Sequence, residues 1–151
     1  MPEPRKINVA LVGYQFMGKA HSNAYRQVSK FFPDMEVEPV LKVLVGRNEE
    51  RVRAAADKFG FAEYATDYRQ VFERSDVDLV DVVTPGNSHA EISIAAARAG
   101  KMVICEKPLA NTVAEAEAMA AAVRENNVPN AVCFNYRRVP AVALAKKMIE
   151  E

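Results

Sequence analysis

A short apolar run that ends in two spaced glycines constrains the fold of this chain more than any other feature. The run covers residues 9–12, Gly13 follows at once, and Gly18 opens a stretch of helical composition. A strand that turns sharply into a helix leaves the unpaired N–H groups and the positive dipole end of the helix at the turn, which suits a dinucleotide pyrophosphate. The fingerprint Gly-x-Gly-x-x-Gly has Gln15 at its middle position, so this turn alone is a weak signal.

Apolar segments with strand character alternate with helical segments along the rest of the chain. Strands are predicted over residues 7–12, 37–45, 62–65, 78–84, 101–105 and 131–134. The predicted helix starts carry capping residues, namely Asn48, Asp67 and two capping boxes, Ser88 with Glu91 and Thr112 with Glu115. Six strands that alternate with helices predict an α/β fold, a doubly wound parallel (Rossmann) sheet with strand order 3-2-1-4-5-6.

Polar clusters follow five of the six predicted strands. Ligands of doubly wound sheets bind beyond the carboxyl ends of the strands, and parallel strands all end at the same edge. The clusters are residues 13–18, 46–48, 84–89, 106–108 and 135–138. We therefore expect a single binding rim along this edge.

Composition excludes several classes of protein. The 151 residues suit one domain, and half of them are hydrophobic with a formal charge of zero, which argues against disorder and against a nucleic-acid partner. Cys105 and Cys133 lie in predicted strands without metal-ligand spacing, so we expect two buried reduced thiols in apolar surroundings and no metal site. Without a signal region or a bilayer-spanning run, the prediction is a cytoplasmic protein that is not bound to a membrane.

The motifs together resemble the Gfo/Idh/MocA family of NAD(P)-dependent oxidoreductases. The resemblance covers nearly the whole chain and rests on Gly13 to His21, on Thr84 and Pro85 with His89, on residues 99–109 with Glu106-Lys107-Pro108, and on Asn135-Tyr136-Arg137 followed by Pro140. It implies an enzyme that moves a hydride between nicotinamide and the hydroxyl or carbonyl carbon of a sugar, cyclitol or similar polyol.

The same resemblance implies a second, C-terminal domain that supplies most of the substrate pocket, a catalytic histidine and usually an oligomer interface. We therefore expect residues 1–138 to form the dinucleotide-binding domain. Residues 139–151 would begin the connection to a substrate domain that this chain lacks, so the fragment alone would turn over poorly. The full-length protein would be a homo-oligomer through that domain.

Lys107 is the residue predicted to carry chemistry. The resemblance places it near the nicotinamide and the substrate hydroxyl, where a lysine can donate a hydrogen bond or transfer a proton; the alternative is an ordinary solvated lysine. Pro108 can form a cis bond that aims Lys107 inward. The predicted cofactor contacts are Gly13, Gln15, Phe16, Met17, Gly18, Gly46, Arg47, Thr84, Pro85, His89, Glu106, Lys107, Asn135 and Arg137. For His89 a structural role is equally open, and His21 is predicted to be structural.

Gly46 and Arg47, at the end of the second predicted strand, bear on the choice of cofactor. An acidic residue there would bind the ribose 2′-OH of NAD, whereas a small residue followed by arginine admits and pairs the 2′-phosphate of NADP. Arg47 lies 34 residues after Gly13, beyond the usual spacing of about 20. NADP is favoured over NAD, and the alternative is that Arg47 stacks on adenine or faces solvent.

Two other functions remain open at this stage. One is a non-catalytic module that senses a dinucleotide, and a weaker one is a transferase that uses another adenosine cofactor. A sensor has no need of Lys107 beside the nicotinamide, so this residue distinguishes the first alternative from the dehydrogenase.

Overall fold

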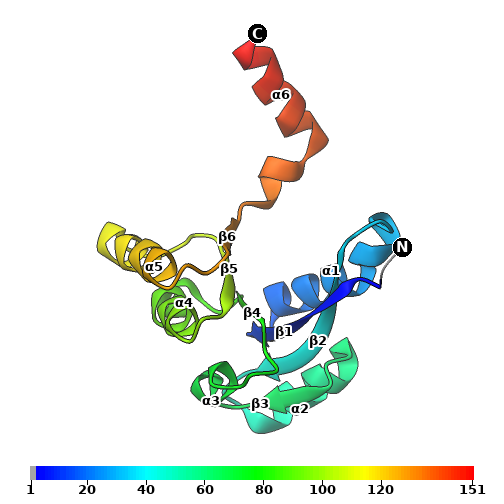
Figure 1. Cartoon of the computed structure of the whole chain (residues 1–151), viewed down its shortest axis with the longest axis vertical. Coiled ribbons are helices and arrows are strands. Elements are labelled where there is room, and N and C mark those ends of the chain that lie inside the picture. Colours follow the sequence, from blue (N-terminus) through cyan, green and yellow to red (C-terminus); the bar gives the residue numbers. More distant parts are fainter. Residues whose placement is uncertain (1–2) are drawn as a thin grey trace.

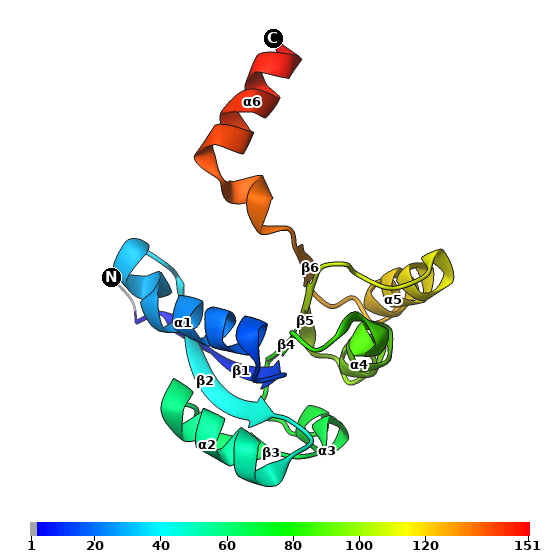
Figure 2. The same cartoon turned by 180° about the vertical axis from the view of Figure 1, so that it is seen from behind.

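A single parallel sheet of six strands forms the centre of the protein, in the order β3-β2-β1-β4-β5-β6 (Figures 1 and 2). The computed structural model describes residues 3–151. The strands are β1 Arg5–Val12, β2 Val37–Val45, β3 Glu63–Ala65, β4 Leu79–Val82, β5 Met102–Glu106 and β6 Asn130–Cys133. Both the predicted fold class and the predicted strand order are confirmed.

Helices follow the strands as predicted. The α-helices are α1 Phe16–Phe31, α2 Glu49–Phe59, α3 Tyr68–Phe72, α4 His89–Arg98, α5 Val113–Glu125 and α6 Pro140–Glu150. Two short 3-10 helices lie at the sheet edge, η1 Gly86–Ser88 before α4 and η2 Asn135–Arg138 after β6.

Alternating side chains of the strands build two separate cores, one on each face of the sheet. Val12 and Val82 belong to the core that α3, α4 and α5 cover, and it also contains Ile92 and Met119. Leu11 belongs to the opposite core, which residues of α2 and the first turn of α1 complete. Because β1 is covered on both faces, it reads as a continuous apolar run, as buried parallel strands do.

Three of the four predicted helix caps are confirmed. Asn48 and Asp67 accept backbone N–H groups at the starts of α2 and α3, and Thr112 forms a capping box at α5. The capping box predicted at Ser88 is wrong. The Ser88 hydroxyl lies 2.8 Å from both Thr84 Oγ1 and the Pro85 carbonyl oxygen, and Ser88 has helical backbone angles, so its oxygen accepts no N–H group of α4.

The last helix projects away from the sheet. In both views α6 follows η2 and extends away from the sheet and from the α-helices that cover it (Figures 1 and 2), and all its residues are exposed, including Leu144 and Ile149. The predicted boundary at residue 138 falls where η2 ends. Whether it separates two domains stays a prediction. Among residues 3–151, no helix combines the length and the apolar character needed to span a bilayer.

Candidate dinucleotide and catalytic site

The turn between β1 and α1 is closed so tightly that positions 13 and 18 have no room for a side chain. Gly13 has a φ of +115°, a conformation that residues with a Cβ rarely adopt. A Cβ at Gly18 would lie 2.3 Å from the Gly13 carbonyl oxygen. The two glycines therefore let the start of α1 pack directly on the end of β1, as the sequence predicts.

The N-terminus of α1 has free donors. Gln15 is the N-cap residue and makes no side-chain capping bond within the described chain, and no acidic residue lies in the first turn. Phe16 is 80% exposed beside it. The first-turn N–H groups and the positive helix dipole therefore fit the pyrophosphate of a dinucleotide.

Residue 46 has to be glycine because the ring of Tyr14 occupies the place of a side chain there. A Cβ at Gly46 would lie 2.2 Å from a carbon of that ring, so Tyr14 can cover the end of β2 only because residue 46 has no side chain. Arg47 follows, exposed, and within residues 3–151 it takes part in no ion pair. Its guanidinium is free to meet a ligand at this edge.

His89 joins the loops that follow β4 and β5. It is 1% exposed, and its ring nitrogens lie 2.7 Å from the Thr84 carbonyl oxygen and 2.8 Å from that of Pro108. Both nitrogens thus face backbone carbonyl oxygens, which accept from whichever nitrogen carries a proton. This arrangement supports the structural alternative for His89, while its contact with a cofactor stays a prediction.

Lys107 is exposed at the end of β5, and its peptide bond to Pro108 is cis, as the sequence analysis allows. Its backbone N–H donates to Glu106 Oε2 at 2.9 Å. The Glu106 side chain is buried and turns back toward α1. The Glu106 carboxylate therefore accepts the backbone N–H of Lys107. Its contact with a cofactor remains a prediction.

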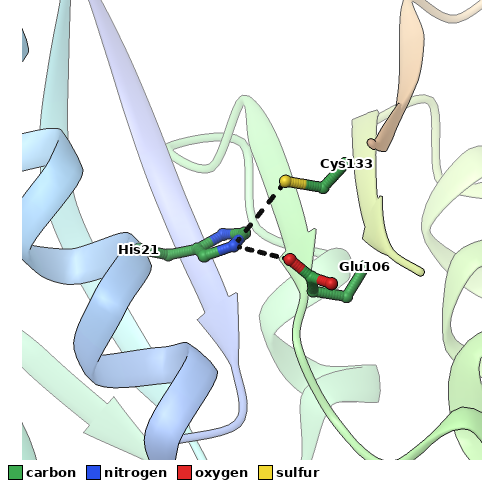
Figure 3. A group of neighbouring side chains, drawn as sticks. All are labelled: His21, Glu106 and Cys133. Atoms are coloured by element: carbon green, nitrogen blue, oxygen red, sulfur yellow. Dashed lines mark hydrogen bonds and ion pairs between the residues drawn. The ribbon is translucent and has the colours of Figure 1, made fainter. Parts of the chain in front are cut away.

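A buried network links Glu106 to α1 and β4. His21 Nδ1 lies 2.7 Å from Asp81 Oδ2. His21 Nε2 lies 3.1 Å from Glu106 Oε1 (Figure 3). Tyr25 also donates to Asp81 Oδ2, at 2.9 Å. Burial lowers the pKa of His21, but the hydrogen bonds and charges of Asp81 and Glu106 outweigh it and raise that pKa above 6.5. The ring can then donate to both carboxylates as an imidazolium.

Cys133 completes a cluster that sequence spacing does not reveal. Its Sγ lies 3.9 Å from His21 Nε2, and one ligand atom each from His21, Glu106 and Cys133 fall within 4.8 Å of one another (Figure 3). The expectation of apolar surroundings is therefore wrong for Cys133, which is half-buried among charged groups. Burial and the neighbouring Glu106 raise the pKa of this thiol to about 11. The absence of a metal site stays a prediction.

The network was missed because its members come from four different elements. A usable signal did exist: Asp81 interrupts an apolar strand and Glu106 ends one, and a carboxylate buried in a parallel sheet needs a partner. Of the other predicted contacts, Asn135 and Arg137 lie exposed in η2 beyond β6. Met17 is half-buried against the core that contains Leu11, and Thr84 and Pro85 follow β4, half-buried and exposed respectively.

All five predicted polar clusters lie at one edge of the sheet, because β1, β2, β4, β5 and β6 are parallel. The structure brings the β4 and β5 loops into direct contact through His89, whereas the β2 loop touches the β1 turn through Tyr14. A parallel sheet with a glycine turn at its switch point and polar loops along the same edge defines a dinucleotide-binding Rossmann domain.

Comparison with known proteins identifies the family. Residues 7–134 match the Gfo/Idh/MocA family, described as an oxidoreductase family with an NAD-binding Rossmann fold. The chain therefore belongs to this family, which confirms the resemblance found in the sequence.

The similar proteins are longer than this chain, and several of them are dehydrogenases. The chain is 51% identical to levoglucosan dehydrogenase of Pseudarthrobacter phenanthrenivorans, over 97% of this chain and 38% of that protein. It is 31% identical to D-apiose dehydrogenase of Paraburkholderia graminis, over 97% and 37%. A structure of levoglucosan dehydrogenase with NADH and levoglucosan matches with a TM-score of 0.93, covering 97% of this chain and 40% of that one. An oxidoreductase domain protein from Kribbella flavida, 56% identical, matches at 0.91 with the same coverage. The chain thus spans about two fifths of the length of these proteins.

Proposed function

We propose that this chain is the cofactor-binding part of a dehydrogenase that transfers a hydride between nicotinamide and a hydroxyl or carbonyl carbon. The observation that carries the proposal is the position of Lys107 on the same sheet edge as the Gly13–Gly18 turn. The turn would hold the pyrophosphate, and the loops after β4 and β5 would meet the nicotinamide end. The protein would bind and orient, while the nicotinamide supplies the redox chemistry.

Lys107 would act on the substrate oxygen. An exposed ammonium beside the nicotinamide can donate a hydrogen bond to a carbonyl oxygen and stabilise the negative charge that develops during reduction. In the oxidative direction the side chain would act as the neutral amine, which accepts the hydroxyl proton and becomes the ammonium while the hydride passes to the nicotinamide. Thr84 and Pro85 would border the nicotinamide through backbone contacts, and Asn135 and Arg137 would contact nicotinamide or substrate.

The substrate would be a sugar, cyclitol or similar polyol. The two relatives named above are dehydrogenases of a sugar and an anhydrosugar, and several inositol 2-dehydrogenases are also similar at 31% identity. The pocket that chooses among such substrates would come mostly from a second domain. The same domain would supply the interface of the proposed homo-oligomer.

The choice between NAD and NADP depends on Arg47. An exposed arginine without an ion pair in the described chain, next to a residue with no side chain, favours the 2′-phosphate of NADP. The structure of levoglucosan dehydrogenase with NADH favours NAD instead. We retain NADP as the predicted preference, with NAD as the alternative.

The experiment for this proposal is substitution of Lys107 in the full-length protein. We expect Lys107→Ala to abolish turnover of polyols while the affinity for dinucleotide is retained. Normal turnover by Lys107→Ala would refute the catalytic role. A protein that binds dinucleotide but oxidises no polyol, with or without the substitution, would instead indicate a sensing module.

A further inference from the structure

The two histidines of the chain contact the residues on either side of Lys107 in the sequence, Glu106 and Pro108. His21 reaches the Lys107–Pro108 segment through Glu106, whose second carboxylate oxygen accepts the Lys107 N–H, and His89 reaches the Pro108 carbonyl oxygen directly. The sequence has no other histidine. Each ring uses both of its nitrogens, one toward the segment and the other toward an anchor in or just after β4.

We propose that His21 and His89 are positioning residues that fix the direction of Lys107, with Asp81 and the Thr84 carbonyl as their anchors. This inference rests on the proposed function, because the role of Lys107 is itself proposed. Neither histidine would touch the substrate. They would act by fixing the main chain on both sides of Lys107, so that its ammonium reaches one place at the sheet edge.

The contacts of His21 bury two carboxylates, and burying charged groups costs free energy of folding. Asp81 is 0% and Glu106 is 5% exposed, and two buried carboxylates destabilise a fold unless they are paired. His21 pairs with both at 2.7 and 3.1 Å. Buried apolar side chains would join α1 to the sheet equally well, but they could not accept a hydrogen bond from the Lys107 N–H.

The contacts of His89 support the same role independently. His89 is almost fully buried at the start of α4, so its ring is held by the helix and the core rather than by solvent. Its two carbonyl acceptors belong to the loops after β4 and β5, both of which carry predicted nicotinamide contacts. A rigid link between these loops would keep Lys107 and the nicotinamide at a constant separation.

The test uses His21→Gln and His89→Gln, because a glutamine amide can keep one of the two hydrogen bonds and limits the loss of stability. In the full-length protein we expect kcat to fall about tenfold or more in both variants, since small misplacement of a catalytic group lowers the rate strongly. The dissociation constant for the dinucleotide should stay unchanged in His21→Gln, whose ring is held by Asp81 and Glu106. Asn23→Ala, an exposed position on α1, is the matched control and should leave kcat unchanged.

A direct readout comes from the amide resonance of Lys107 in the 151-residue chain, recorded by ¹⁵N–¹H NMR. In His21→Gln this resonance should move and its hydrogen exchange should accelerate, while Asn23→Ala leaves both unchanged. If the glutamine variants lower Tm but alter neither kcat nor the Lys107 resonance, the histidines only stabilise the fold and the proposal is wrong.

Lys107→Ala separates this proposal from the function it rests on. If that variant is inactive and both histidine variants are fully active, only the positioning role is wrong. If Lys107→Ala turns over polyols normally, the proposed function is wrong and the positioning role falls with it. If one glutamine variant fails to fold, the other still tests the positioning role of its own histidine.

Discussion

A Cβ at Gly18 would lie 2.3 Å from the carbonyl oxygen of Gly13. This contact fixes where α1 begins relative to β1, and with it the place toward which the free N–H groups of the helix point. The geometry of the glycine turn therefore depends on Gly18, which is buried and has no side chain.

Gly18→Ala should therefore weaken both the fold and the binding of dinucleotide. The added methyl would meet backbone rather than a flexible side chain, and overpacking of this kind costs about 1–3 kcal/mol. Thermal unfolding with and without NADH measures both effects, and Asn23→Ala serves as the control. A Gly18→Ala protein with unchanged Tm and affinity would contradict the close contact.

Gln15→Gly should raise the affinity for dinucleotide. Gln15 stands where the fingerprint has its middle glycine, and its side chain has to move aside for the pyrophosphate or donate to it. We expect the first effect to be larger, so the dissociation constant measured by NADH fluorescence should fall. An unchanged constant would show that Gln15 does not hinder binding.

Stability at low pH should depend on the ion pairs around Arg74. Hydrogen bonds from Arg74, and then from Lys42, lower the pKa of Glu63 to about 2. A carboxylate with a lowered folded-state pKa contributes stability above its ordinary pKa of 4.5, and the contribution is lost as pH falls from about 5 toward 2.

The measurement is urea unfolding of the natural chain and of Arg74→Met at pH 7 and at pH 3. Arg74→Met should be less stable at pH 7, modestly because these side chains are partly exposed, and the difference should shrink at pH 3. A difference that is equal at both pH values would mean that Arg74 acts through packing alone.

We expect no bound metal at His21, Glu106 and Cys133. His21 Nε2 already lies at hydrogen-bond distance from Glu106 Oε1, and both the raised pKa of His21 and that of Cys133 oppose the deprotonation that metal binding requires. Added Zn²⁺ or EDTA should leave Tm and NADH affinity unchanged. A Co²⁺–thiolate absorption band that disappears in Cys133→Ser and persists in Cys105→Ser would contradict this.

The fold could be predicted almost completely because its signals are local. Apolar runs such as residues 9–12, glycine stops such as Gly60, and caps such as Thr112 each act within a few residues. The error at Ser88 arose because Ser88 already lies in the η1 turn with helical backbone angles, whereas a capping residue is usually extended. The local pattern does not show that a short 3-10 turn precedes α4.

The loops that form the site could be predicted from the sequence, but the side-chain contacts between them could not. Parallel strands end at one edge, so the five clusters follow from the topology alone. The links between Glu106 and His21, and between His89 and Pro108, depend on which side chains face each other across elements far apart in the sequence. Sequence spacing does not contain that information, although the buried acid Asp81 indicates that a partner exists.

The central claim is that this chain binds a nicotinamide dinucleotide at the edge defined by Gly13 and Gly18. The most direct measurement is fluorescence titration of the 151-residue chain with NADPH and with NADH. Saturable binding is expected, tighter for NADPH, and Arg47→Glu should remove that preference while leaving NADH bound. Equal affinity for the two would defeat the NADP preference only. No saturable binding of either dinucleotide by the folded chain would contradict the account.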